Sequence, residues 1–209
     1  ITGGGTGIGR GIAESFIAEG GIIVISGRRA GVLDNATTEL ESGGGTVMAV
    51  QSDVTKESDV ISLFKQTIDR FGRVDILVNN AGSNTPQVID EIKDQDWDHI
   101  VELNLTSCMA LTRAFAPQMK ERKWGRVIHI SSIVGLAGAP ARNVYAATKA
   151  GLIGMSRSSA IDLGRHGITV NCIAPGPFLT ELPQTLLTEE QRNMLSERTA
   201  LGRWGDPKE

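Results

Sequence analysis

The sequence predicts an α/β protein with a doubly wound parallel sheet, in which helices cover both faces of the sheet. Short apolar runs rich in β-branched residues recur along the chain. They are continuous instead of alternating with polar residues, which is typical of strands buried on both faces. The segments between the runs are long enough for helical crossovers, and strand-helix-strand repetition indicates a parallel sheet.

Each element follows from this pattern in order. The strand runs are Ile22 to Ser26, Val47 to Gln51, Val74 to Val78, Val127 to Ser131 and Ile168 to Ala174. The helical segments are Ile8 to Glu19, Gly31 to Glu41, Glu57 to Phe71, Asp96 to Lys120 and Asn143 to Gly164. The string Thr188-Glu189-Glu190-Gln191 opens a further helix, which runs from Gln191 to Arg198. This organisation is that of a Rossmann fold, whose ligands bind beyond the carboxyl ends of the strands.

Composition supports one soluble domain, residues 1–209. A chain of 209 residues with 40% hydrophobic content can bury a core, and its net charge of −3 does not favour a nucleic acid or an anionic membrane as partner. No apolar run approaches the roughly 20 residues of a membrane-spanning helix. Cys108 and Cys172 have no metal-site spacing, so we expect no metal, two structural thiols and a reducing compartment, the cytoplasm.

Both ends of the chain look truncated. The chain begins with Ile1-Thr2, where a buried first strand is expected before the glycines that follow, and it stops at Asp206-Pro207-Lys208-Glu209, which is typical of a helix start. We therefore expect the fold to be cut at both ends. A targeting segment would lie before Ile1, so organellar targeting stays open.

The first strand end carries a glycine turn, Thr2-Gly3-Gly4-Gly5-Thr6-Gly7-Ile8-Gly9. Glycines between a strand and a helix let the backbone approach a pyrophosphate, and the helix N-terminus supplies N–H groups for it. The spacing is G-x-x-x-G-x-G, through Gly3, Gly7 and Gly9, and differs from G-x-G-x-x-G. Its place before a helix in a strand-helix-strand unit favours a dinucleotide site over a flexible turn.

The second strand end indicates which dinucleotide is bound. It reads Ser26-Gly27-Arg28-Arg29, and no carboxylate occurs there before Asp34. Arginines at this place favour the 2′-phosphate of NADP, whereas an acidic residue favours NAD. Arg10 is expected to reach the same phosphate, so we predict NADP(H), with NAD(H) as the alternative. The competing interpretation of Arg28 and Arg29 is that both are solvated loop charges.

A candidate acid–base pair lies in the last long helix. Tyr145, the single tyrosine, precedes Lys149 by four residues, so the two side chains share one helix face. One ammonium ~4 Å from the phenolate, at an effective dielectric constant of about 20, supplies the roughly 4 kcal/mol that would lower a tyrosine pKa to about 7. Ser132 follows a strand run and would hydrogen-bond a carbonyl oxygen. The alternative is a surface tyrosine beside a snorkelling lysine.

These residues together resemble the classical short-chain dehydrogenases/reductases. The resemblance covers essentially the whole chain and includes the glycine turn, Asp53-Val54, Asn79-Asn80-Ala81-Gly82, Asn104, Ser132, Tyr145-x-x-x-Lys149, and Pro175-Gly176 with Thr180. Taken alone, the Asp53 and Asn79 motifs are ordinary turn formers. Among members of the family, 3-oxoacyl-carrier-protein reductases and gluconate or glucose dehydrogenases look most similar.

The resemblance implies a role for each catalytic residue. Tyr145 would donate or accept the proton, Ser132 would hold the carbonyl, Lys149 would bind the nicotinamide ribose and lower the pKa of Tyr145, and Asn104 would hold a water. Besides Tyr145 and Lys149, the residues expected at the cofactor are Gly3, Thr6, Gly7, Ile8, Gly9, Arg10, Arg28, Asp53, Val54, Asn80, Ala81, Gly82, Pro175, Gly176 and Thr180.

The resemblance also implies the activity and the partners. We expect NADP(H)-dependent interconversion of a carbonyl and a secondary alcohol, most similar to 3-oxoacyl reduction, with a sugar dehydrogenase or a non-catalytic dinucleotide-binding regulator as alternatives. Residues 182–204 form the expected substrate lid. Leu182, Leu186, Leu187, Met194 and Leu195 either line the pocket or hold the lid helix down. A homodimer or homotetramer is expected through the helical segments Asp96 to Lys120 and Asn143 to Gly164.

Overall fold

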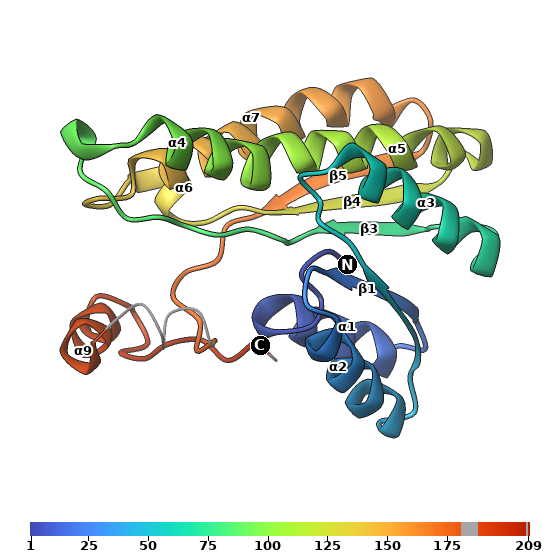
Figure 1. Ribbon diagram of the computed structural model, residues 1–209, viewed down its shortest axis with the longest axis horizontal. Helices are drawn as coiled ribbons and strands as arrows, with labels where there is room; N and C mark the ends of the chain where they lie inside the picture. The colour runs from blue at the N-terminus through green and yellow to red at the C-terminus, as the bar shows by residue number, and fades with distance from the viewer. Residues whose placement is uncertain (181–187, 208) are drawn as a thin grey trace. The chain divides into compact units, whose positions relative to one another are not determined.

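A computed structural model describes residues 1–180, 188–207 and 209, in two compact units (Figure 1). The first unit contains Ile1, Gly3–Gln51 and Pro175–Glu209, and the second contains Thr2 and Ser52–Ala174. All strands pair in parallel, and helices alternate with them along the chain, which confirms the predicted α/β class. Within the described residues, no helix is long and apolar enough to span a membrane.

The first unit is a two-stranded sheet covered by two helices. Strand β1 (Ile22–Gly27) pairs with β2 (Thr46–Gln51) in a register that sets Ile22 opposite Thr46. Helices α1 (Gly7–Ala18) and α2 (Ala30–Ser42) pack against this sheet. The buried core consists of Ala13, Ile23, Ile25, Leu33, Ala36 and Leu40. Ile23 and Ile25 of β1 belong to this core. The backbone N–H groups of Gly3 and Gly4 donate to the Ser26 carbonyl of the same strand, so the glycine turn is attached to a close-packed part of the unit.

The C-terminal part of the first unit contains helix α9 (Glu189–Glu197). The Oγ1 of Thr188 accepts a hydrogen bond from the backbone N–H of Gln191, and the Gln191 side chain accepts one from the backbone N–H of Thr188. This reciprocal capping box is what the string Thr188-Glu189-Glu190-Gln191 predicts, and it starts the helix two residues before the predicted Gln191. Trp204 is buried and donates its indole N–H to the Arg192 carbonyl.

The second unit contains a three-stranded sheet in the order β3–β4–β5, formed by Ile76–Asn79, Gly125–Ile130 and Ile168–Ile173. Its helices are α3 (Glu57–Phe71), α4 (Asp94–Val101), α5 (Ser107–Arg122), the short α6 (Val134–Ala137) and α7 (Asn143–Gly164), with a 3₁₀ turn at Ile89–Glu91. Helices α4, α5 and α7 lie together on one side of this sheet (Figure 1).

Two helices of the second unit, α3 and α7, have the predicted bounds, and the strands differ from prediction by two residues or fewer at each end. The segment Asp96 to Lys120 differs from a single helix. It contains the end of α4, a π-helical turn at Glu102–Thr106, and most of α5. A π turn holds an extra residue and is frequent at functional sites. Here the turn carries Asn104.

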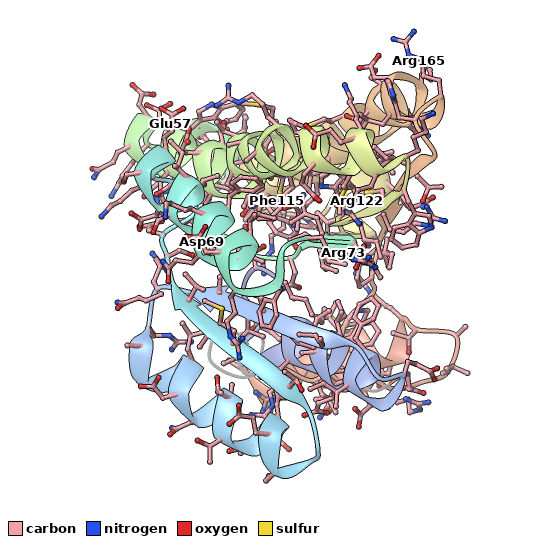
Figure 2. The ribbon with its side chains drawn as sticks, turned by 90° about the vertical axis from the view of Figure 1, so that its right-hand side faces the viewer. Glu57, Asp69, Arg73, Phe115, Arg122 and Arg165 are labelled. Carbon is pink, nitrogen blue, oxygen red and sulfur yellow. The ribbon has the colours of Figure 1, made fainter. Side chains whose placement is uncertain are left out.

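Helix α3 packs beside α5 through aromatic side chains. The rings of Phe64 and Phe115 meet edge to face with centroids 5.1 Å apart. In Figure 2, Glu57 and Asp69 mark the two ends of α3, and Phe115 lies on α5 between the helices and the sheet. At its N-terminal end, α3 also contacts α5 through Glu57 and Arg113, a surface pair at 3.4 Å.

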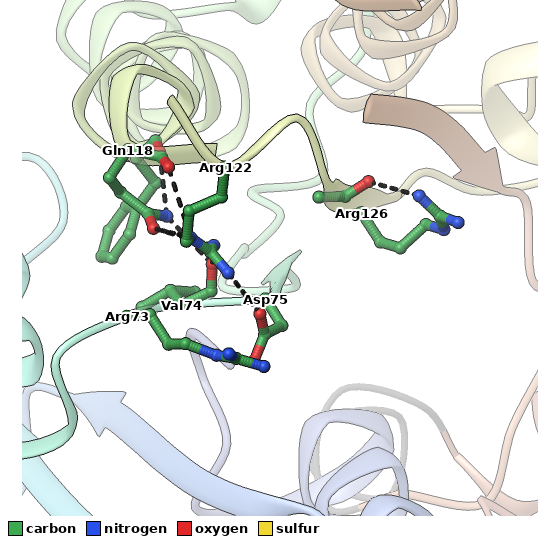
Figure 3. Close-up of polar contacts among 8 residues, drawn as sticks. Arg73, Val74, Asp75, Gln118, Arg122 and Arg126 are labelled. Carbon is green, nitrogen blue, oxygen red and sulfur yellow. Dashed lines mark hydrogen bonds and ion pairs between the residues drawn. The ribbon is translucent and has the colours of Figure 1, made fainter. Parts of the chain in front are cut away.

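The C-terminal end of α5 is tied to the start of β3 by Arg122 (Figure 3). Its Nη1 lies 2.6 Å from Asp75 Oδ1, and its Nη2 donates to the Val74 carbonyl and, at 2.8 Å, to Gln118 Oε1. Arg73 Nε donates to the second oxygen of Asp75. Burial raises the pKa of Asp75, but the hydrogen bonds from Arg122 and Arg73 and their charges outweigh it and lower the pKa.

We expect Arg122→Met to lower the free energy of unfolding by about 1–2 kcal/mol at neutral pH, because partly exposed charged hydrogen bonds are lost. The Asp75 pKa is depressed in the folded state. Its stabilising effect is therefore present above the unfolded pKa near 4 and is lost as the pH falls through the folded pKa. The difference between the two proteins should shrink in acid. Urea unfolding at several pH values tests this.

The matched control is Arg113→Met, which removes the exposed ion pair between Arg113 and Glu57. Exposed ion pairs contribute at most about 1 kcal/mol, so this variant should unfold close to the parent protein. Equal losses in the two variants would contradict the role given to Arg122.

Candidate active site

The residues after β4 contact helix α7 and hold it against the end of the strand. Lys149 Nζ donates a hydrogen bond of 2.7 Å to the Ile130 carbonyl, the last carbonyl of β4. Ser131 Oγ donates to the Lys149 carbonyl at 2.8 Å. Ser132 Oγ accepts from the backbone N–H of Val134 and so shapes the turn into α6. The structure therefore brings Ser132 and Lys149 to the same end of the sheet.

Lys149 is buried, with 4% of its surface exposed. Burial lowers its pKa, and the nearby thiols of Cys108 and Cys172 act in the opposite direction. Its Nζ lies 5.6 Å from the centroid of the Tyr145 ring. The shared helix face predicted for these two residues is thus seen in the structure.

Tyr145 differs from the expectation of a lowered pKa. Burial raises its pKa, and a hydrogen bond with Ser132 and the charge of Arg142 lower it by a smaller amount. The expected effect of Lys149 is missing because the ammonium is directed at the Ile130 carbonyl. The phenol therefore holds its proton at neutral pH and is suited to donate it.

Asn104 is fully buried in the π-helical turn. Its Oδ1 accepts from the backbone N–H of Ser83, and its Nδ2 donates to the Ser83 carbonyl, both at 2.9 Å. Nδ2 also lies 3.3 Å from Thr148 Oγ1, and this hydroxyl donates to the Tyr145 carbonyl. Both amide hydrogens are thus used within the protein, so the side chain positions Ser83 and α7, and the role of Asn104 in holding a water stays a prediction.

The loop after β3 is held by Thr2 on one side and by Asn104 on the other. The backbone N–H groups of Asn80 and Ala81 donate to Thr2 Oγ1 at 3.0 and 3.1 Å, and Asn80 Nδ2 donates to the Thr2 carbonyl. A Cβ at Gly82 would lie 3.1 Å from Asn104 Oδ1 and 3.5 Å from Lys149 Nζ. A side chain at this position would therefore crowd Asn104 Oδ1. Thr2 was missed as a positioning residue by sequence reasoning, which treated it only as part of the glycine turn.

Asp53 builds a turn before α3. Its Oδ1 accepts from the backbone N–H and the hydroxyl of Thr55, and its own N–H donates to Asp59. Val54 is buried. This Asx turn agrees with the interpretation of the motif as an ordinary turn former, and the contact of Asp53 with the cofactor stays a prediction.

The glycine turn of the first unit has the backbone that a phosphate requires. Gly3 and Gly7 have φ of +64° and +54°, a region that favours glycine. A Cβ at Gly4 would lie 2.7 Å from Ile25, and one at Gly7 would lie 3.2 Å from the Thr180 side chain. Thr6, the N-cap of α1, makes no capping bond with its side chain, and the first turn, with Ile8 and Gly9, has no acidic residue. These features fit the pyrophosphate of a dinucleotide.

The arginines near this turn are not equivalent. Arg10 is engaged with carboxylates, at 3.1 Å from Glu14 and 2.6 Å from Glu39, so the expectation that it faces the 2′-phosphate is not supported. Arg28 and Arg29 follow β1 and are exposed, and neither forms an ion pair with another described residue. An NADP site here rests on these two side chains.

The remaining predicted residues lie in the C-terminal part of the first unit. Pro175 and Thr180 are half-buried, and Gly176 is exposed. In the expected lid, Leu182, Leu186 and Leu187 lie outside the described residues. Met194 on α9 is 48% exposed, which favours neither of the two roles considered for the apolar lid residues.

Known proteins of one family are similar to this chain. The family model described as short chain dehydrogenase matches residues 1–191. The chain is 38% identical over 207 residues to (2S)-[(R)-hydroxy(phenyl)methyl]succinyl-CoA dehydrogenase subunit BbsD of Thauera aromatica, covering 99% of this chain and 83% of that one. It is 35% identical over 210 residues to a 3-oxoacyl-[acyl-carrier-protein] reductase of Synechocystis, covering 100% and 83%.

A solved structure is similar over the same range. A variant of the actinorhodin polyketide ketoreductase, with NADPH, has a TM-score of 0.96 and 30% identity, covering 100% of this chain and 84% of that one.

Proposed function

The chain belongs to the short chain dehydrogenase family, and we propose that it is an NADP(H)-dependent reductase of 3-oxoacyl compounds. It is an oxidoreductase that interconverts a carbonyl group and an alcohol. The observation that carries the proposal is the placement of a protonated Tyr145 beside Ser132, with Lys149 on the same helix face. The names of the Synechocystis and Thauera relatives support an acyl thioester as substrate.

The residues of the second unit divide the acid–base work. The Ser132 hydroxyl donates a hydrogen bond to the substrate oxygen and keeps this oxygen beside the phenol. Tyr145 transfers its proton to that oxygen as negative charge develops there. The charge of Arg142 stabilises the phenolate that remains. The nicotinamide dinucleotide, when bound, supplies or takes the hydride.

The glycine turn is assigned to the pyrophosphate, through backbone N–H groups at the start of α1. Asn80 and Gly82 border the cofactor in this proposal, as do Pro175, Gly176 and Thr180. The preference for NADP(H) is assigned to Arg28, with Arg29 next to it, since a guanidinium forms paired hydrogen bonds with a phosphate.

We expect Arg28→Ala to raise the dissociation constant of NADPH by about 10- to 100-fold and to change that of NADH by less than about 3-fold. The reason is that charge-assisted hydrogen bonds to the 2′-phosphate are lost only for NADPH. Titration of both dinucleotides by fluorescence measures this. Arg10→Ala is the control, because Arg10 already pairs with Glu14 and Glu39 and should not discriminate between them. Equal losses of both cofactors in Arg28→Ala would refute the assignment.

The function itself is tested by cofactor oxidation with 3-oxoacyl thioesters, 5-ketogluconate and simple ketones. We expect the highest kcat/KM with a 3-oxoacyl thioester and NADPH. Preference for 5-ketogluconate would instead identify a sugar dehydrogenase. No turnover of any carbonyl compound would overturn the proposal and favour a dinucleotide-binding regulator.

We also propose a homo-oligomer formed through α5 and α7. Met109 on α5 and Ile161 on α7 are apolar and exposed, at 39% and 81%, and a Cβ at Gly154 would meet nothing within 4 Å. These exposed apolar side chains would be covered in such an interface. Light scattering on the purified protein measures the mass.

A further inference from the structure

Arg142 is half-buried, and one nitrogen of its guanidinium lacks a protein partner in the described structure. Its Nη1 is buried and makes no hydrogen bond within the described part of the chain. No carboxylate among residues 1–180, 188–207 and 209 pairs with it within 4.0 Å. Guanidinium groups stay protonated at all ordinary pH values, and a buried charge without a partner is costly. Buried guanidinium donors rarely lack a partner, so a ligand is the expected partner of Arg142 Nη1.

The backbone around Arg142 is fixed. Arg142 is the N-cap of α7 and forms an isolated parallel bridge with Gln87. The Gln87 N–H donates to the Ala141 carbonyl at 3.0 Å, and Asn143 Nδ2 donates to the Gln87 carbonyl at 3.2 Å. The backbone that carries the Arg142 side chain therefore belongs to a braced loop and not to a free surface segment.

Gln87 shows the same incomplete pairing. Its Nε2 donates to Asp96 at 2.7 Å, whereas its Oε1 is buried and unpaired in the described structure. A donor on Arg142 and an acceptor on Gln87 thus stand without protein partners on the two residues of one bridge. Asn84, in the same loop as Gln87, also has a buried unpaired oxygen.

Arg142 also lies near the reacting group. It precedes Tyr145 by three residues at the start of α7. The two side chains interact electrostatically. Burial lowers the pKa of Arg142 and raises that of Tyr145, and the interaction between the two groups acts against burial in both cases. A ligand atom bound by Arg142 would therefore be close to the carbonyl that Tyr145 protonates.

We propose that Arg142 binds a carboxylate of the substrate, and that this protein acts on carbonyl compounds that carry a carboxylate near the reacting carbon. This inference rests on the function proposed above. The planar guanidinium matches the two oxygens of a carboxylate and binds them in a paired geometry. Gln87 Oε1 would accept from a hydroxyl or amide hydrogen of the same ligand. The reacting compound is a free oxo acid or a thioester whose acyl group has its own carboxylate.

The experiment compares matched substrates that differ in one group. The pairs are 3-oxobutanoate with 3-oxobutanamide and 4-oxopentanoate with 4-oxopentanamide, each assayed with NADPH. The full chain should show a kcat/KM at least about 10-fold higher for the acid of one pair. Arg142→Met should lower the kcat/KM of the acid about 10- to 100-fold more than that of the amide, the range of a charge-assisted hydrogen bond to the carboxylate, because any loss that acts through Tyr145 affects both substrates equally. Arg142→Lys should recover part of the loss. Arg165→Met, at the exposed other end of α7, is the control and should change neither.

The other outcomes count against the inference in distinct ways. If Arg142→Met lowered kcat/KM equally for the acid and the amide, Arg142 would act only through Tyr145 and would not bind the carboxylate. No preference for either acid in the parent protein, with turnover of a simple 3-oxoacyl thioester, would overturn the carboxylate site and keep the proposed function. No turnover of any carbonyl compound would overturn both.

A second measurement does not depend on whether Arg142→Met folds. In the parent protein, 2-methylpropanoate should inhibit competitively at a concentration at least about 10-fold lower than 2-methylpropanamide. Equal inhibition by the two would contradict the proposal.

Discussion

Replacing Tyr145 by phenylalanine should lower kcat by about 10²- to 10⁴-fold, the contribution of a positioned acid–base group. The phenol is half-buried and protonated, and it is the group that delivers the proton to the substrate oxygen. The ring itself keeps its packing, so dinucleotide binding and the melting temperature should stay near those of the parent protein. Single-turnover kinetics with NADPH and a 3-oxoacyl thioester measure the loss directly.

The control for this substitution is binding. Titration of NADPH should give dissociation constants within about 3-fold for the two proteins, because the aromatic ring is kept. Turnover of Tyr145→Phe at more than about a tenth of the parent rate would refute the role given to the phenol. A Ser132→Ala variant should lose rate as well, since the hydroxyl no longer holds the carbonyl oxygen beside the phenol.

Asn104→Ala should lower the free energy of unfolding by about 2–4 kcal/mol. The change leaves the N–H and the carbonyl of Ser83 without their 2.9 Å partners in a fully buried place, and each unpaired group costs about 1–3 kcal/mol. Turnover should fall too, because Ser83 follows Gly82 directly and α7 is held by the same amide through Thr148. Denaturant unfolding and steady-state kinetics below the melting temperature measure both effects.

Thr148→Val is the matched control, because it keeps the shape of the side chain and removes the hydroxyl. That hydroxyl contributes a weaker contact with Asn104, at 3.3 Å, and a bond to the Tyr145 carbonyl. We expect a loss of about 1 kcal/mol. If Asn104→Ala were as stable as Thr148→Val, the contacts of Asn104 with Ser83 would not be the main stabilising contribution of this side chain.

The regular elements could be predicted because their signals are local. The apolar runs of β1 to β5 and the helical segments between them need only the residues that form them, and the bounds of α3 and α7 agree with prediction. The π-helical turn around Asn104 had no such signal. Its residues, Glu102 to Thr106, continue a helical pattern, and the side chain bonds to Ser83, 21 positions away.

The candidate site shows the same division. Sequence alone set Tyr145 and Lys149 on one helix face and Ser132 at a strand end, because helix period and strand position determine these places. It also supplied the glycines whose positive φ the turn requires. Arg142 was missed, although a cation one turn before the single tyrosine was a visible signal.

The direction of each charged side chain was decided by tertiary structure. Lys149 donates to the Ile130 carbonyl, and Arg10 pairs with Glu14 and Glu39. Burial, which raises the pKa of Tyr145, also depends on segments distant in sequence. Periodicity determines which face a residue occupies, whereas hydrogen-bond partners and burial depend on which distant segments pack there. The sequence therefore determined the fold class and the residues of the site, and packing decided their charges and contacts.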